Sequence, residues 1–248
     1  MITLSSNPAI AEAFNSALAE YKLEGICPNA PEKLAVYYQL LCNYNEQMNL
    51  VGNTDFDDAL VRHYIDSFAP LEQTQLFENV KTIVDVGTGA GFPGMVLAII
   101  RPDWEVTLVD SLNKRLAFLK VVADTLSLTN VHFEHMRAEV AGHQPHLREQ
   151  FDIALSRAVA PLNVLCEYLL PLVKIGGRMI AYKGPAAPIE LAKATGVARK
   201  LGGAPSAAFG VNLPANTPWT RTLVTSRKIE ITDPKYPRRE GIPTKKPL

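Results

Sequence analysis

The chain has 248 residues, of which 47% are hydrophobic and 20% charged, as in an ordinary globular protein. A chain of this length can bury a sizeable core, which excludes intrinsic disorder. No run approaches the ~18 apolar residues of a membrane span, so we expect no membrane association. The first nine residues contain no Lys or Arg, which argues against a secretory signal. The cysteines Cys27, Cys42 and Cys166 are widely spaced, and we expect reduced thiols in a cytoplasmic protein with no metal site.

The formal net charge of zero hides a strong asymmetry along the chain. Residues 1–80 carry a net charge of −8, residues 81–220 carry +3 and residues 221–248 carry +5. Such polarity indicates one face for an anionic partner, although a solvated basic tail explains the same pattern.

The first eighty residues predict a small helical subdomain. Apolar residues recur at helical spacing over residues 7–20 and 31–45. Thr54 and Asp55 are good caps for a third helix that follows them.

From residue 81 onward, short β-branched runs alternate with helical patterns. We predict strands at residues 82–86, 105–109, 131–133, 151–155 and 178–182, and helices at 94–101, 113–126, 161–173 and 187–201. Gly176 and Gly177 are expected to end the third of these helices. The alternation predicts an α/β doubly wound, mostly parallel sheet, which residues 208–212 and 222–231 complete as an antiparallel pair. The predicted parts are a helical subdomain over 1–80, a Rossmann-like core over 81–232 and a basic tail over 233–248.

A glycine-rich loop follows the first strand. The sequence there is Asp85-Val86-Gly87-Thr88-Gly89-Ala90-Gly91-Phe92-Pro93-Gly94. Glycines allow a sharp turn and a close approach to a ligand, and a helix follows at once. This pattern predicts the crevice in which doubly wound sheets bind nucleotides.

The spacing of the glycines favours one kind of nucleotide over another. The dinucleotide fingerprint requires a third glycine at position 92, where Phe92 stands, which disfavours an NAD-dependent oxidoreductase. The D-x-G-x-G-x-G pattern resembles the first motif of class I S-adenosylmethionine-dependent methyltransferases, in which Asp85 would place a carboxylate near the cationic sulfonium. Asp110 ends the second strand and can accept both ribose hydroxyls, which the two cofactors share. Methyltransferases of this class contact adenine after the third strand, where Ala138 and Glu139 lie.

The motifs that the sequence lacks narrow the kinds of methyl acceptor. Ser156-Arg157-Ala158 stands where amino-directed nucleic-acid methyltransferases carry Asn-Pro-Pro-aromatic. Cys166 lies among leucines, and we interpret it as a packing thiol, not as the nucleophile that pyrimidine C5 methylation requires. Guanine N7 carries a lone pair and no hydrogen, so its methylation requires no general base. Protein arginine, carboxyl and small-molecule acceptors stay open at this point.

Several segments together resemble one family, the small-subunit ribosomal RNA guanine-N7 methyltransferases also called glucose-inhibited division protein B. The resemblance covers nearly the whole chain, with weak similarity over residues 186–220. Its most specific segments are Arg62-His63-Tyr64-Ile65-Asp66-Ser67, Gly91-Phe92-Pro93-Gly94 and Tyr236-Pro237-Arg238-Arg239. Asn49-Leu50-Val51 departs from the Asn-Leu-Thr that the family often shows.

The resemblance implies S-adenosylmethionine as cofactor and 16S ribosomal RNA, free or in an assembling small subunit, as partner of a monomeric enzyme. The cofactor residues would be Gly87, Gly89, Gly91, Phe92, Asp110, Ala138, Glu139 and Arg157. The RNA-binding residues would be Arg62, His63, Lys114, Arg115, Arg137, Lys183, Arg221, Arg238 and Arg239. No catalytic base is expected, and Tyr44, Tyr64 or Phe92 could stack on the target base. A non-catalytic RNA-binding module with the same fold is a further alternative.

Two groups of basic residues have a physical argument of their own. Lys114 and Arg115 open a helix, where a cation is unfavourable unless an outside anion is bound. The basic tail is expected to act on RNA through phosphate charge, without contact to the cofactor.

Overall fold

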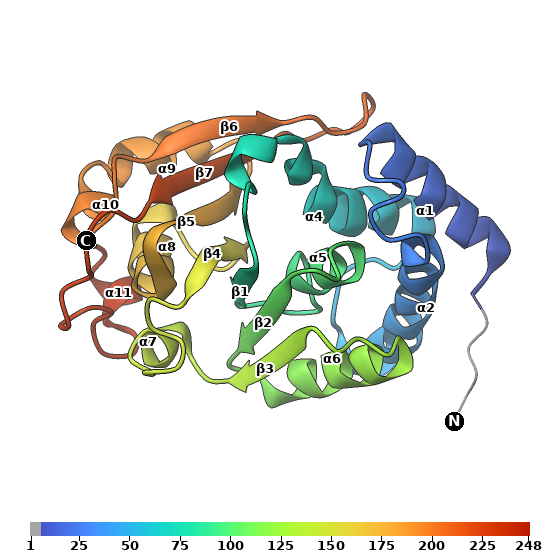
Figure 1. Cartoon of the computed structure of the whole chain (residues 1–248), viewed down its shortest axis with the longest axis horizontal. Helices are drawn as coiled ribbons and strands as arrows, with labels where there is room; N and C mark the ends of the chain where they lie inside the picture. The colour runs from blue at the N-terminus through green and yellow to red at the C-terminus, as the bar shows by residue number, and fades with distance from the viewer. Residues whose placement is uncertain (1–5) are drawn as a thin grey trace.

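The computed structural model describes residues 6–248, and a seven-stranded sheet forms its centre (Figure 1). The strand order is β3-β2-β1-β4-β5-β7-β6. The strands are β1 (Thr82–Val86), β2 (Glu105–Asp110), β3 (Val131–His135), β4 (Phe151–Arg157), β5 (Val173–Lys183), β6 (Ala207–Val211) and β7 (Arg221–Arg227). The expectation about a secretory signal falls partly on residues 1–5, which lie outside the described residues.

The pairing of the strands confirms the predicted doubly wound sheet. β1 to β5 pair in parallel, whereas β7 is antiparallel to both β5 and β6. From β1 the chain adds β2 and β3 on one side of β1, and it then returns to add β4 on the other side. The carboxyl ends of β1 and β4 therefore flank a crevice.

The prediction that Gly176 and Gly177 end a helix is wrong, because both lie inside β5. Helix α8 (Leu162–Leu169) and the turn η4 (Leu170–Leu172) stop earlier. A Cβ on Gly177 would lie 2.5 Å from the carbonyl oxygen of Asp152 on β4. The glycine therefore permits close approach of two strands where their register shifts.

Helices cover both faces of the sheet (Figure 1). Along β1, Ile83 packs on one face and Val84 on the other, as the pleat requires. The first face is covered by the N-terminal helices together with α5 (Gly94–Ile100) and α6 (Asn113–Thr125). The second is covered by α7 (Ala138–Ala141), α8, α9 (Ala187–Lys193) and α10 (Val197–Lys200).

The N-terminal helices share one continuous core with the first face. They are α1 (Pro8–Glu20), α2 (Ala30–Met48), α3 (Phe56–Ala59) and α4 (Asp66–Phe68), followed by the turns η2 (Ala69–Glu72) and η3 (Thr74–Leu76). Between α3 and α4 the predicted third helix widens into a π-helical turn, η1 (Leu60–Ile65). Such turns are frequent at functional sites.

The C-terminal part departs from the predictions in two places. The helix expected over residues 187–201 is divided into α9 and α10 by Gly196, whose φ is +77°. Residues 233–248, here called the C-terminal tail, pack against α7 and α8 and include the short helix α11 (Ile242–Lys245). Within residues 6–248 there is no helix long and apolar enough to cross a membrane.

Candidate cofactor and nucleic-acid site

A cavity of about 530 Å³ opens at the carboxyl ends of β1, β2, β3 and β4. Seven of the eight predicted cofactor residues line it, namely Gly87, Gly89, Phe92, Asp110, Ala138, Glu139 and Arg157. His63, Arg115 and Arg137, predicted to bind RNA, line the same cavity. The sequence pattern and the topology therefore indicate the same place.

The glycine loop has the left-handed backbone that its residues favour. Gly87 and Gly89 have φ values of +74° and +61°, and a Cβ on Gly89 would meet no atom closer than 4.0 Å. The cavity thus has open space where a side chain would otherwise stand. Gly91 does not line the cavity, contrary to its predicted role. A Cβ there would lie 2.5 Å from the Tyr37 hydroxyl, which donates to the Ala90 carbonyl behind the loop.

Asp85 stabilises the glycine loop and is completely buried. Its Oδ2 accepts hydrogen bonds from the Thr88 hydroxyl (2.8 Å) and the Gly94 amide (2.9 Å). Burial raises the pKa of this carboxyl to about 6, against the opposing effect of these two hydrogen bonds. The expectation that Asp85 faces the ligand is wrong, because it is absent from the cavity lining.

Asp110 lies at the end of β2 and joins the loop to the cavity. Its Oδ2 accepts from the Gly89 amide (2.9 Å), and its Oδ1 accepts from the Leu112 amide (2.9 Å). Arg115 lies 3.4 Å from the same carboxylate. A carboxylate has about four lone-pair positions, so acceptor capacity is left for a ligand.

Glu139 stands beyond the end of β3 and is 5% exposed. Its Oε1 accepts from the Tyr168 hydroxyl (3.2 Å) and from the Gly241 amide of the C-terminal tail (2.9 Å). Within residues 6–248, its Oε2 accepts no hydrogen bond. One carboxylate oxygen is therefore fixed while the other is left as an acceptor.

Arg157 stands at the opposite end of the cavity and is held by a buried acid. Its guanidinium lies 2.6 Å from Asp66 of α4, and Arg221 of β7 binds the same carboxylate at 2.6 and 2.9 Å. Asp66 is completely buried. The next residue, Ala158, has a φ of +57°, a strained conformation of the kind found at functional sites.

His63 and Phe92 form an aromatic wall on this side of the cavity. Their rings stack with centroids 4.9 Å apart, and the Arg157 guanidinium lies over Phe92 at 5.4 Å. Burial and the neighbouring Arg157 charge lower the pKa of His63 to about 4. The imidazole is therefore neutral at physiological pH.

The basic residues predicted to bind RNA fall into two groups. Lys114 and Arg239 are exposed, as are Arg62 and Arg137, which pair with the carboxylates of Asp58 and Glu240. The RNA-binding prediction is not supported for Lys183, Arg221 and Arg238, because each pairs with a carboxylate inside the protein. Their partners are Glu190 (2.7 Å), Asp66 and Glu167 (2.7 Å) respectively.

The three aromatic residues considered for base stacking have different surroundings. Tyr64 has no exposed surface, so it cannot stack on a base. Tyr44 packs against Phe118 with centroids 5.3 Å apart. Phe92 lines the cavity and has its outer face covered by His63.

The cavity also has lining residues that sequence reasoning missed. Leu50 and Val51, at the position where the sequence departs from the family pattern, supply apolar surface, and Tyr168 and Val159 come from α8 and the preceding loop. The family comparison could have singled out Leu50 and Val51. Tyr168 carries no local signal, because its role depends on contact with Glu139, 29 residues away.

The cysteines agree with the packing interpretation. Cys166 is buried, and burial raises the pKa of its thiol to about 12. Among the described residues, all three cysteines are free, and there is no cluster of acidic, His or Cys side chains that could hold a metal ion.

Comparisons with known proteins agree on one family. The model of the GidB family, rRNA small subunit methyltransferase G, matches residues 30–212. The chain is 44% identical to ribosomal RNA small subunit methyltransferase G of Lactobacillus johnsonii, over 96% of this chain and 99% of that protein. It is 43% identical to the protein of that name from Alkaliphilus metalliredigens, over 89% and 91%.

Solved structures support the fold. A predicted O-methyltransferase from Agrobacterium tumefaciens is 19% identical with a TM-score of 0.50, over 65% of this chain and 78% of that one. A 16S rRNA (adenine(1408)-N(1))-methyltransferase from Catenulisporales acidiphilia is also 19% identical with a TM-score of 0.50, over 66% and 93%. With the sheet order and the cavity described above, these matches show that the chain has a class I methyltransferase fold and belongs to the GidB family, rRNA small subunit methyltransferase G.

Proposed function

We propose that the protein is an S-adenosylmethionine-dependent methyltransferase that methylates N7 of a guanine in small-subunit ribosomal RNA. The observation that carries the proposal is the cavity, which is lined by the glycine loop, Asp110 and Glu139. Membership of the methyltransferase G family supplies the substrate class.

The residues present fit this cofactor. Asp110 would accept the ribose hydroxyls, and Gly87 and Gly89 leave room for the chain to pass close to the ligand. Glu139 and Ala138 would contact the adenine edge. Because β2 and β1 separate β3 from β4, Glu139 and Arg157 stand at opposite ends of the cavity. The adenine would therefore lie near Glu139, and the acceptor base near Arg157, Phe92 and His63.

The protein residues would act by positioning. Bound S-adenosylmethionine supplies a methyl group on a cationic sulfur. Guanine N7 gives its lone pair to the new bond and has no proton to lose, so the positive charge passes from sulfur to the base and no proton moves. His63 and Phe92 would orient the base and exclude water, which converts the transfer into an in-line step between fixed partners.

This chemistry agrees with the pKa of His63 in the cavity and with that of Cys166, which lies outside the cavity. A working base requires a pKa near the operating pH, but the pKa of His63 is about 4 and Cys166 is buried with a pKa of about 12. Neither group is suited to accept a proton at neutral pH. A guanine N7 acceptor requires none.

A transfer assay tests the proposal. Purified protein is incubated with radiolabelled S-adenosylmethionine and with small-subunit or large-subunit particles from a strain that lacks the corresponding gene. We expect label in the small-subunit RNA alone, and much less of it with Asp110→Ala at the same cofactor concentration. Label in large-subunit RNA, in ribosomal protein or in neither would contradict the proposed substrate.

A further inference from the structure

The C-terminal tail reaches the cavity at the end where the proposed function places adenine. The Gly241 amide donates to Oε1 of Glu139 (2.9 Å). The Tyr168 hydroxyl donates to the same oxygen and lies 3.2 Å from the Thr244 hydroxyl of α11. The tail therefore touches the one acidic side chain proposed to recognise adenine.

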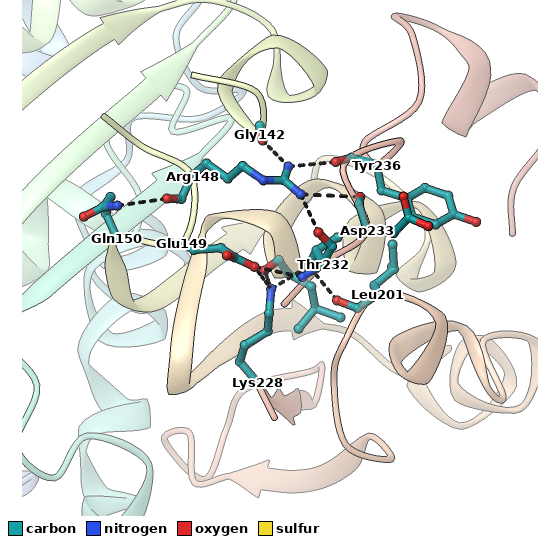
Figure 2. A network of polar contacts seen from close by, with 10 residues as sticks. Gly142, Arg148, Glu149, Gln150, Leu201, Lys228, Thr232, Asp233 and Tyr236 are labelled. Atoms are coloured by element: carbon teal, nitrogen blue, oxygen red, sulfur yellow. Dashed lines mark hydrogen bonds and ion pairs between the residues drawn. The ribbon is translucent and has the colours of Figure 1, made fainter. Parts of the chain in front are cut away.

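Arg148 connects the beginning of this tail to the rest of the protein by hydrogen bonds (Figure 2). The Arg148 guanidinium donates to the carbonyl oxygens of Gly142 (2.6 Å), Thr232 (2.7 Å) and Tyr236 (2.8 Å), and lies 3.4 Å from that of Asp233. These are backbone atoms on both sides of the junction between α7 and the tail. A guanidinium has five donors in a fixed fork, so no other side chain can make this set of bonds.

A buried lysine strengthens the same junction (Figure 2). Lys228 has no exposed surface, and its Nζ lies 3.0 Å from Glu149 and donates to the Leu170 carbonyl (2.7 Å). Glu149 accepts the Thr232 amide (2.8 Å), and the Thr232 hydroxyl donates to the Leu201 carbonyl (2.6 Å). Thr232, directly before the tail, is thus held by Glu149 and Leu201.

The middle of the tail is fastened separately. Glu167 of α8 is completely buried and accepts the amide and guanidinium of Arg238 at 2.7 Å each. Pro237 packs so closely on α7 that a Cβ on Gly142 would lie 2.4 Å from its Cγ. These contacts, with the bond from the Gly241 amide to Glu139, hold the tail against α8 and the end of α7 at several points.

We propose that the C-terminal tail is a positioning element for cofactor recognition, with Arg148 as its central anchor. By holding Gly241 and Thr244 in place, the tail fixes Oε1 of Glu139, so that Oε2 faces the exocyclic amine of adenine. This inference rests on the proposed function and revises the expectation that the tail has no contact with the cofactor site. Arg148 and the tail are positioning residues, because their effect passes through Glu139.

The test measures binding of S-adenosylhomocysteine and of S-inosylhomocysteine, in which a carbonyl replaces the adenine amine. We expect the intact protein to prefer the adenosyl compound, since Oε2 of Glu139 can accept from an amine and repels a carbonyl. Arg148→Lys keeps the charge but not the fork, and Tyr168→Phe removes one donor to Glu139. Each variant should weaken binding of the adenosyl compound by about tenfold and reduce the preference for it over the inosyl compound. A purely structural role would leave that preference unchanged.

A matched variant and a folding measurement complete the test. Lys246→Gln removes one charge from the exposed part of the tail and should change neither affinity nor preference. Circular dichroism checks that each variant is folded. If Arg148→Lys does not fold, Tyr168→Phe still provides the comparison. Unchanged affinity and preference in both anchor variants would overturn the inference. Absence of binding by the intact protein would instead count against the proposed function.

Discussion

Single buried carboxylates determine the geometry of the site. Asp85 and Asp110 accept backbone amides from the same glycine loop, but from different sides, and only Asp110 reaches the cavity. Motifs of this kind mix residues that contact a ligand with residues that hold the loop. The two roles are distinguished by burial and hydrogen-bond partners, which the sequence does not contain.

Asp110→Ala should weaken S-adenosylmethionine binding strongly. In the proposed site the carboxylate accepts from the ribose, and the loss of one hydrogen bond to a charged group costs about 1.5–3 kcal/mol. We therefore expect the Kd to rise by between ten- and a hundredfold, measured by isothermal titration calorimetry. Asp103→Ala removes an exposed carboxylate and should bind normally. Unchanged affinity in a folded Asp110→Ala variant would show that this residue only stabilises the loop and does not bind the cofactor.

His63 and Asp85 should give the stability opposite dependences on pH. The pKa of His63 falls from 6.5 to about 4 on folding, so its contribution is complete above pH 6.5 and is lost as the pH falls toward 4. The pKa of Asp85 rises from 3.8 to about 6, so the cost of burying its charge grows as the pH rises through that range. The two effects oppose each other in the intact protein.

Single variants should separate these two effects. Relative to the intact protein, Asp85→Asn should gain up to about 3 kcal/mol of stability between pH 4 and pH 6, because it carries no charge to bury. His63→Gln should lose less stability on acidification. Urea unfolding of the unliganded protein at pH 4.5 and 6.5 measures both, and parallel pH profiles for all three proteins would contradict the assigned pKa directions.

At the scale of elements, the segment made of α3, η1 and α4 (residues 56–68) joins the N-terminal helices to the sheet. Asp66 binds Arg157 at the end of β4 and Arg221 at the start of β7, so one carboxylate connects three parts of the chain. The same segment presents His63 to the cavity. Within the Arg-His-x-x-Asp-Ser motif, Asp66 thus holds Arg157 in position, and His63 lines the cavity.

Asp66→Asn should destabilise the protein by about 3–5 kcal/mol, because it leaves two largely buried guanidinium groups without an opposite charge. Guanidinium chloride unfolding measures the change. Asp58→Asn disrupts a more exposed pair with Arg62 in the same segment and should cost less than about 1 kcal/mol. Equal losses in the two variants would show that the buried triad has no special importance.

The elements differ in how well the sequence predicts them. The strands were predictable because short apolar runs alternate with helical patterns, and the position of Asp110 follows from its place at the end of β2. The end of α8 was misplaced because Gly176 and Gly177 serve a strand contact, not a helix end. Arg157, by contrast, depends on a partner 91 residues away, and no local pattern reports such a pair.

At the scale of the whole molecule, some basic residues of the C-terminal part pair with carboxylates inside the fold. Arg221 of the basic C-terminal part binds Asp66 of the acidic N-terminal part, and Arg238 binds Glu167. The sequence cannot distinguish a basic residue that pairs with a distant carboxylate from one that faces RNA. Exposure leaves Arg62, Lys114, Arg137 and Arg239 as the better candidates for phosphate contact.

The salt dependence of RNA binding should therefore differ between two lysines that look alike in sequence. Lys114→Gln should flatten the slope of log affinity against log salt by about 0.7, the value for one phosphate contact on a single strand. Lys183→Gln should leave this slope unchanged, because Lys183 is buried against Glu190. Filter binding at several salt concentrations measures both slopes. The reverse result would assign the phosphate contact to the buried lysine.

The atom that receives the methyl group can be identified directly. Small-subunit RNA methylated by the purified protein is digested to nucleosides and analysed by mass spectrometry against standards for each methylated guanosine. We expect 7-methylguanosine at one position, in a much smaller amount when the cavity variant Asp110→Ala replaces the intact protein at the same cofactor concentration. A methyl group on an exocyclic amine or on a ribose hydroxyl would contradict it, because those acceptors must release a proton, which His63 with a pKa of about 4 is poorly suited to accept.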